Sequence, residues 1–144
     1  MKTYEEASSE IINEFQMLDE WLDKYNHIIE LGKTLPLIDE KYKTENYLIS
    51  GCQSQVWLYA DYKDGMVFFT ADSDAIITKG IVNILIRVLS GRSCDEIINA
   101  DMEFINKIGL REHLSPTRSN GLNSMIKQMK LYALVYKTKF ESNK

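Results

Sequence analysis

Two cysteines supply the only thiols of the 144-residue chain, and one of them, Cys52, falls in a polar stretch. Its neighbours are Ser50, Gly51, Gln53 and Ser54, and the glycine permits a tight or left-handed turn. A thiolate in such a loop, close to several backbone N–H groups, is a nucleophile able to attack sulfur or carbon. The alternative is that Cys52 is a small core residue, because free cysteine is among the most buried residue types.

The second cysteine, Cys94, belongs to Ser93-Cys94-Asp95-Glu96, which has the spacing of a helix capping box. The helix dipole favours a thiolate in this first turn, but the two carboxylates that follow oppose it. We therefore interpret Cys94 as a structural or surface residue and use it as a control for Cys52.

A cysteine-dependent hydrolase would also need a base, and the only imidazoles are His27 and His113. His27 falls within a patterned helix and is interpreted as a surface or boundary residue. His113 precedes Pro116, and the sequence leaves open whether it approaches Cys52. The cysteines are far apart in the chain, as are the histidines, so no short pair predicts a metal site.

A charged candidate, Arg118, follows Pro116 in a segment expected to be a loop, with Ser119 or Asn120 capping the helix after it. Two interpretations stay open for this side chain. It is either a solvated surface arginine, or it contacts a partner or orients a reactive anion by hydrogen bonding.

These residues must be positioned by helices that apolar spacing predicts at both ends of the chain. The first helix begins at the capping box Thr3 to Glu6, and the second has Asp19 as its expected cap and ends at Gly32, so the two should form a hairpin. A core helix is expected over 75–89, capped by Ser73 or Asp74. A short helix from Ser93, short turns to His113 and a long C-terminal helix complete the helical elements.

Between these helices, aromatic and β-branched residues predict strands over 47–49, 55–62 and 66–71, with a turn at 63–65. Val56, Leu58 and Ala60 alternate with Trp57, Tyr59 and Asp61, so one face is aliphatic and the other aromatic. The expected fold is α+β, with a small antiparallel three-stranded sheet packed by helices. The expected order is α-α-β-β-β-α-α-α in one domain, 1–144.

Composition agrees with a globular protein, since 44% of residues are hydrophobic and 26% are charged. Seventeen Lys and Arg against 21 Asp and Glu give a net charge of −4, which argues against nucleic acid as a partner. No apolar stretch approaches the length of a membrane span, and the first residues lack the pattern of a signal peptide. Two cysteines exclude a disulfide framework, so we expect a cytoplasmic protein with free thiols.

Three ordered motifs resemble the SufE family of sulfur acceptor proteins. The first is Gly51-Cys52-Gln53-Ser54-Gln55-Val56-Trp57, the second is Asp72-Ser73-Asp74-Ala75, and the third runs from Leu114-Ser115-Pro116-Thr117-Arg118 to Ser119-Asn120-Gly121-Leu122. The resemblance extends back to the stretch from Ile28 to Pro36, so it covers nearly the whole chain. It implies a SufE/IscU-like fold.

What this resemblance implies is a sulfur carrier rather than an enzyme. Cys52 would take persulfide sulfur from a SufS-like cysteine desulfurase, stimulate it, and pass the sulfur on to an iron–sulfur scaffold. Gly51, Gln53 and Ser54 would support Cys52, and Asp74 and Arg118 match motif positions near its loop or the desulfurase-facing surface. Pyridoxal phosphate belongs to the desulfurase, and the acceptor itself would need no cofactor or metal.

The carried persulfide must be hidden from reductants, and we expect the loop to fold its sulfur against the aromatic side of the sheet. Two alternatives remain at this stage. One is a cysteine hydrolase that uses Cys52 with His113, and the other is a non-catalytic interaction module in which Cys52 belongs to the core.

Overall fold

The computed structural model describes residues 2–141; Met1 and residues 142–144, which belong to the expected 1–144 domain, lie outside the described residues. Helices pack on a three-stranded antiparallel sheet, so the predicted α+β class is confirmed. The elements in chain order are α1 (Tyr4–Gln16), α2 (Trp21–Gly32), the 3-10 helices η1 (Glu40–Tyr42) and η2 (Glu45–Tyr47), β1 (Val56–Lys63), β2 (Met66–Ser73), α3 (Ile76–Leu89), β3 (Arg92–Ser93), α4 (Cys94–Asn99), α5 (Glu103–Lys107), α6 (Leu110–His113) and α7 (Pro116–Phe140).

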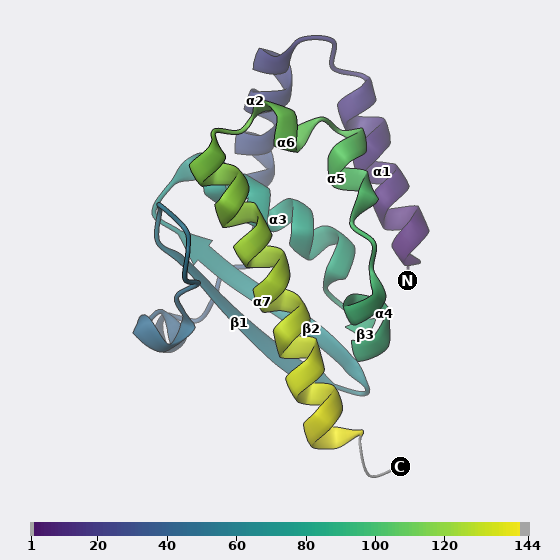
Figure 1. The fold of residues 1–144 in the computed structure, drawn as a ribbon, viewed down its shortest axis with the longest axis vertical. Coiled ribbons are helices and arrows are strands. Elements are labelled where there is room, and N and C mark those ends of the chain that lie inside the picture. Colours follow the sequence, from purple (N-terminus) through teal and green to yellow (C-terminus); the bar gives the residue numbers. More distant parts are fainter. Residues whose placement is uncertain (1, 142–144) are drawn as a thin grey trace.

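Helix α3 is the centre of the fold, with the β1–β2 hairpin on one side and α1 and α2 on the other (Figure 1). Its crossing with α2 is close, because a Cβ added at Gly80 would lie 1.9 Å from the Ile28 carbonyl oxygen. Only glycine permits this approach of the two backbones. None of the described helices is long and apolar enough to cross a membrane.

Three polar side chains of α3, those of Lys79, Asn83 and Arg87, bind neighbouring elements. Lys79 forms an ion pair with Asp72, and the buried Asn83 side chain donates to the Leu31 carbonyl at 2.6 Å. One turn further on, Arg87 binds Glu10 and Glu14 of α1. This stripe therefore joins α3 to the sheet and to both helices of the N-terminal hairpin.

The third strand is not where the sequence predicted it. Residues 45–47 form η2, and the expected strand at 47–49 is reduced to a bridge between Leu48 and Trp57. The third strand is β3, which pairs with the start of β2 so that the sheet order is β1-β2-β3. The chain turns back at Gly91, where φ is +80°. A two-residue strand is too short to show the alternation that predicts strands.

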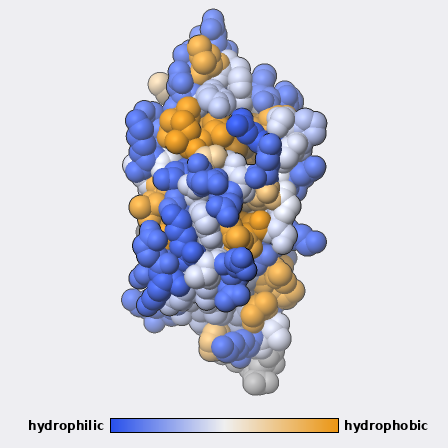
Figure 2. All heavy atoms as spheres, turned by 90° about the vertical axis from the view of Figure 1, so that its left-hand side faces the viewer, coloured by the Kyte–Doolittle hydropathy of each residue, from blue (hydrophilic) through white to orange (hydrophobic). Residues whose placement is uncertain are grey.

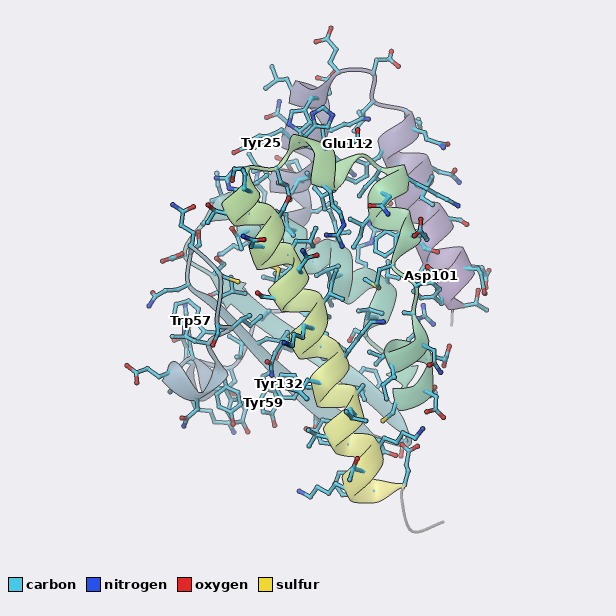
Figure 3. All side chains as sticks on the ribbon, viewed as in Figure 1. Tyr25, Trp57, Tyr59, Asp101, Glu112 and Tyr132 are labelled. Atoms are coloured by element: carbon cyan, nitrogen blue, oxygen red, sulfur yellow. The ribbon has the colours of Figure 1, made fainter. Side chains whose placement is uncertain are left out.

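The two faces of the sheet differ as predicted. Val56, Leu58 and Ala60 are buried in the core beneath the helices, whereas Trp57 and Tyr59 point to the other side (Figure 3). Helix α7 also closes the free edge of β1. The Tyr132 hydroxyl donates to the Leu58 carbonyl at 2.9 Å, and the Tyr136 hydroxyl donates to the Ala60 carbonyl at 2.7 Å. Side chains thus satisfy carbonyls that would otherwise offer an open strand edge.

Helix caps follow the sequence only in part. The capping boxes at Thr3 and Ser93 are confirmed. Glu20, not Asp19, occupies the cap position of α2, and Ala75 precedes α3 without a side-chain cap. Helix α7 begins earlier than predicted, because its cap is Ser115 rather than Ser119 or Asn120 and Pro116 takes its first turn. Proline is favoured there, since that N–H has no helical partner.

Candidate functional site

The Cys52 loop connects η2 to β1 and bends sharply at Gly51, where φ is +86°. A side chain at this position would be strained, because L-residues other than glycine rarely adopt positive φ. It would also collide with α7, since a Cβ at Gly51 would lie 2.7 Å from Ser124 Oγ. Glycine therefore lets the loop fold onto α7.

The base of this loop is tied to the end of β2. The Gln55 N–H donates to the Asp74 carboxylate at 3.1 Å, and the Asp74 N–H donates back to the Gln55 carbonyl at 3.3 Å. Ser73 Oγ donates to the same carbonyl at 2.8 Å. Ser73 and Asp74 were expected to cap α3, and in the structure they hold the Cys52 loop instead. Asp74 is thus a positioning residue outside the cavity described next.

Cys52 itself lies partly buried at a cavity of about 230 Å³ between its loop, α3 and α7. Its Sγ donates to the Gly121 carbonyl at 3.7 Å. The cavity is lined by Cys52, Gln53, Ser54, Thr78, Ile81, Thr117, Arg118, Gly121 and Met125. The structure therefore brings together four of the predicted site residues, which are Cys52, Gln53, Ser54 and Arg118. Gly51 and Asp74 shape the loop from outside.

The expected resting place of the sulfur is wrong. Thr78 and Ile81 come from α3, and Gly121 and Met125 come from α7, so Cys52 faces the helical side of the sheet rather than its aromatic side. Thr78 and Ile81 fall in the core helix predicted over 75–89 and Met125 falls in the predicted C-terminal helix, but the sequence did not assign any of the three to the site. The only signal for them was spacing, because residues three or four apart share one helix face.

The chemical state of the thiol follows from this burial. Loss of solvation raises the pKa of Cys52, because an apolar environment disfavours the thiolate. Its hydrogen bond to a carbonyl also requires the protonated form. The expectation that backbone N–H groups of the loop stabilise a thiolate is not met in this conformation. This closed conformation therefore favours the protonated thiol over the nucleophilic thiolate.

Arg118 is an exposed residue in the first turn of α7, and not in a loop as predicted. Its backbone N–H donates to the Ser115 cap at 3.3 Å, which fixes the start of its side chain. The guanidinium forms no ion pair within residues 2–141, although it lines the Cys52 cavity. A positive charge whose donors have no partner within residues 2–141 therefore lies at the rim of the thiol site.

Cys94 is fully buried between α4 and α7. Burial and the neighbouring Glu141 carboxylate raise the pKa of Cys94 to about 11. The raised pKa keeps the Cys94 thiol protonated at neutral pH, and its burial separates the thiol from solvent. The structural interpretation of Cys94 is therefore the one that its surroundings support.

Neither histidine belongs to the thiol site. His27 Nε2 lies 2.9 Å from Glu14 Oε1, and His113 stacks on Trp21 with ring centroids 4.1 Å apart. His113 does not line the Cys52 cavity, so the pair that a hydrolase would need is not assembled. Within residues 2–141, no three His, Cys, Asp or Glu side chains gather as a metal site.

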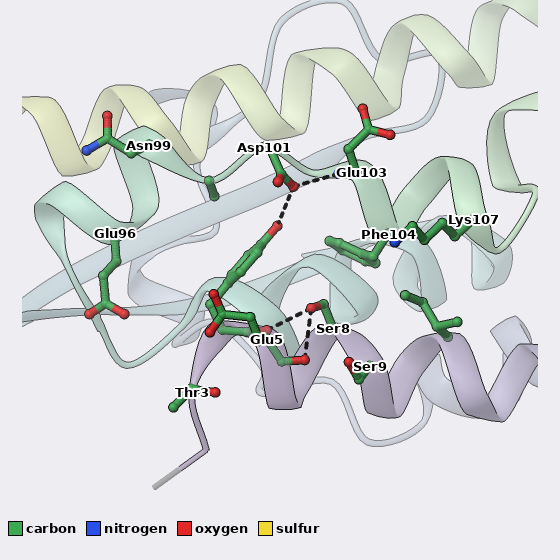
Figure 4. A pocket seen from close by; sticks show the side chains of 13 residues that line it. Thr3, Glu5, Ser8, Ser9, Glu96, Asn99, Asp101, Glu103, Phe104 and Lys107 are labelled. Atoms are coloured by element: carbon green, nitrogen blue, oxygen red, sulfur yellow. Dashed lines mark hydrogen bonds between the residues drawn. The ribbon is translucent and has the colours of Figure 1, made fainter.

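A larger cavity, of about 570 Å³, lies between α1 and the α4–α5 region (Figure 4). Tyr4 bridges it, with its hydroxyl donating to the Asp101 carboxylate at 3.5 Å and accepting from the Met102 N–H. Its lining includes Glu5, Glu96 and Glu103 but no cysteine or histidine. The larger cavity therefore holds no nucleophilic thiol, and we take the smaller cavity that contains Cys52 as the candidate site.

This fold and site define a class of small α+β protein that keeps a loop cysteine in a cavity rimmed by an arginine. Comparison with known proteins names the family, because the model described as "SufE: Fe-S metabolism associated domain" matches residues 9–133. The chain belongs to the SufE family, which is associated with iron–sulfur metabolism.

Similar proteins agree with this assignment. An uncharacterized SufE-like protein of Rhizobium meliloti is 44% identical over 126 residues, which cover 84% of this chain and 90% of that protein. SufE-like protein 1, chloroplastic/mitochondrial, of Arabidopsis thaliana is 38% identical over 93% of this chain, which spans 36% of the plant protein. The solution structure of a hypothetical protein from Thermus thermophilus has a TM-score of 0.76 at 20% identity, covering 92% of this chain and 96% of that one. This last likeness confirms the fold.

Proposed function

We propose that this protein accepts sulfur from the persulfide of a SufS-like, pyridoxal phosphate-dependent cysteine desulfurase onto Cys52, stimulates that desulfurase, and delivers the sulfur to an iron–sulfur scaffold. The observation that carries the proposal is the storage of Cys52 in a small cavity rimmed by Arg118, with no base beside it. A hydrolase needs a base to activate its nucleophile, whereas a sulfur acceptor needs a thiol that it can present and then hide.

The transfer step needs no oxidant. The Cys52 thiolate attacks the outer sulfur of the donor persulfide and forms a new S–S bond. The S–S bond of the donor breaks, and its electron pair leaves on the thiolate of the desulfurase cysteine. The proton of the Cys52 thiol passes to solvent or to the partner before the attack. The product is a persulfide on Cys52, and delivery to the scaffold repeats the same exchange.

The cavity supports storage of this product. Its volume of about 230 Å³ is several times the roughly 30 Å³ that one water molecule occupies in the liquid, so an added sulfur atom has room. Ile81 and Met125 supply apolar walls that limit access of solvent reductants. Arg118 supplies a positive charge for a persulfide anion or for a carboxylate of the partner.

The loop is also tied in a way that suits presentation. Its base is fixed by Asp74 and Ser73, whereas Cys52 is held within the cavity by one weak hydrogen bond from sulfur. The tip can therefore leave the cavity while the base stays in place. We assign this exchange to the cytoplasm, where reductants keep both cysteines as thiols.

Mass spectrometry after incubation with a cysteine desulfurase and free cysteine tests the proposal. We expect the peptide that contains Cys52 to gain multiples of about 32 Da, because only this thiol can reach solvent. Cys52→Ser should abolish the gain and the stimulation of the desulfurase, whereas Cys94→Ala should keep both. Sulfur on Cys94 alone would contradict the assignment.

A second arm separates the hydrolase alternative. His113→Ala should leave sulfur acceptance unchanged, because its ring stacks on Trp21 and does not line the cavity. Loss of acceptance in a His113→Ala protein with an unchanged melting temperature would favour a Cys52–His113 pair.

A further inference from the structure

The outer face of the sheet carries two pairings of an aromatic ring with a carboxylate. Trp57 of β1 lies opposite Asp72 of β2, and Asp61 of β1 lies opposite Phe68 of β2. Each pair places a ring and a carboxylate on neighbouring strands and on the same face, within reach of one ligand. Such a combination attracts cations, through the ring face and through the charge.

The first pair already holds a cation of this chain. Lys43 Nζ lies 2.9 Å from an Asp72 carboxylate oxygen and 4.9 Å from the centroid of the Trp57 ring. Lys79 Nζ lies 3.3 Å from the other oxygen of the same carboxylate. Within this molecule, the pair formed by Trp57 and Asp72 therefore binds a lysine ammonium group.

The second pair has no such cation. Asp61 is exposed and forms no ion pair within residues 2–141, and the Phe68 side chain is 38% exposed. Both residues line a groove of about 370 Å³ on the outer face, together with Leu37, Asp39, Tyr42, Tyr59 and Thr70. No lysine, arginine or histidine contributes to this lining, which therefore carries two carboxylates and no positive charge.

Ring stacking and a capping hydrogen bond hold the side chains that line this groove. Tyr42 stacks on Tyr59 with ring centroids 3.9 Å apart and nearly parallel planes. Asp39 is fixed as the cap of η1, where its carboxylate accepts from the Lys41 N–H at 3.1 Å. Lys41 Nζ lies 5.0 Å from the centroid of the Tyr42 ring, and Lys63 follows Asp61 by two residues on the same face of β1, but neither lysine lines the groove. Leu37 is 61% exposed and adds apolar surface suited to the stem of a long side chain.

We propose that this groove over Asp61 and Phe68 is a docking site for a lysine or arginine side chain of a protein partner. Its volume lies at the small end of ligand pockets, so it accommodates one long side chain rather than a folded element. The net charge of −4 also favours a basic partner segment. The groove lies on the face of the sheet away from α3 and α7, so a partner bound there leaves the Cys52 cavity accessible. The proposal is independent of the sulfur chemistry of Cys52.

A titration followed by two-dimensional ¹H–¹⁵N NMR tests this site. The probe is an acetylated and amidated Gly-Lys-Gly-Lys-Gly peptide, and the control ligand is the same peptide with acetylated lysine side chains. We expect the charged peptide to shift the amide signals of Tyr59, Asp61, Phe68 and Thr70. The uncharged peptide should bind about threefold to thirtyfold more weakly, because it loses both the cation–π contact and the ion pair. Equal binding of the two peptides would overturn the proposal.

Matched variants separate the groove from general attraction to an acidic surface. Asp61→Asn removes the charge, and Phe68→Leu removes the ring face while keeping an apolar side chain. Each should weaken binding about twofold to fivefold with an unchanged melting temperature. Asp23→Asn, at an exposed carboxylate of α2, should have no effect. If Asp23→Asn weakens binding as much as Asp61→Asn does, the attraction is non-specific and the docking site does not exist.

Discussion

Replacing Gly51 by alanine should loosen the Cys52 loop without unfolding the protein. A non-glycine residue at φ +86° costs about 1–2 kcal/mol, and the new Cβ would lie 2.7 Å from Ser124 Oγ. The Ser124 side chain can rotate away, so the backbone strain is the larger part. Since about 1.4 kcal/mol is a factor of ten, the open form of the loop should become about fivefold to thirtyfold more populated.

The assay is the rate at which iodoacetamide labels Cys52, followed by peptide mass mapping. Labelling requires the open loop, so its rate should rise by the same fivefold to thirtyfold. Gly65→Ala is the matched control, because Gly65 has φ +80° and nothing lies within 4 Å of an added Cβ. It should lower the melting temperature through similar strain and leave Cys52 labelling unchanged.

A double variant separates the two contributions. Adding Ser124→Ala to Gly51→Ala removes the collision and keeps the strained φ, so labelling should slow but stay faster than in the unmodified protein. The reasoning is refuted if Gly51→Ala labels Cys52 at the unmodified rate although its melting temperature falls as far as that of Gly65→Ala.

Three further outcomes are expected. Burial raises the pKa of Cys52, so the closed loop is stabilised when the thiol is protonated. This stabilisation of the closed loop is fully present below the ordinary thiol pKa and is lost as pH rises through the raised pKa of Cys52. Iodoacetamide labelling of the folded protein should therefore keep increasing above about pH 8.5, where labelling of the urea-unfolded chain levels off; identical pH profiles would contradict a buried thiol. Arg118→Ala should change stability by no more than about 1 kcal/mol but lower desulfurase stimulation, with partial rescue by Arg118→Lys, and unchanged stimulation in both variants would make Arg118 a solvated surface residue. Asn83→Ala leaves the Leu31 carbonyl without its side-chain donor, so thermal and urea unfolding should show a loss of about 1–3 kcal/mol while sulfur acceptance persists; an unchanged melting temperature would show that this hydrogen bond contributes little.

The distribution of hydrophobic side chains on the surface bears on whether substitutions would cause aggregation. On the face drawn in Figure 2, hydrophobic side chains gather in separate patches with charged and polar side chains between them. No single patch dominates that face, so changes of one exposed residue there are not expected to cause aggregation.

Prediction from sequence worked best where a feature depends on residues three or four apart. The capping boxes at Thr3 and Ser93 are such features, since each joins a hydroxyl to a backbone N–H within one turn. The hairpin of β1 and β2 and its two unlike faces were likewise readable from alternation and from the glycine turn. The prediction failed at β3, because two residues carry no period.

The same limit explains the wrong helix starts. Ser73 and Asp74 have the side chains of helix caps, but both form hydrogen bonds with the backbone of Gln55, which is distant along the chain. At α7, Ser119 or Asn120 was the expected cap, but Ser115 has a capping side chain too, and Pro116 suits the first turn after it. More than one residue near the start of α7 could cap it by its local chemistry, and the folded chain uses only Ser115.

For the site, the sequence by itself determined the family and predicts Cys52 as the reactive residue, because Cys52, its loop and Arg118 belong to ordered motifs of the chain. Tertiary structure alone decided that the loop folds toward α3 and α7, that Thr78, Ile81 and Met125 line the cavity around the sulfur, and that burial raises the pKa of the thiol. The physical reason is that hydrogen bonds within a turn depend on neighbours in sequence. Desolvation depends on every atom that packs around a group, and those atoms come from elements far apart along the chain.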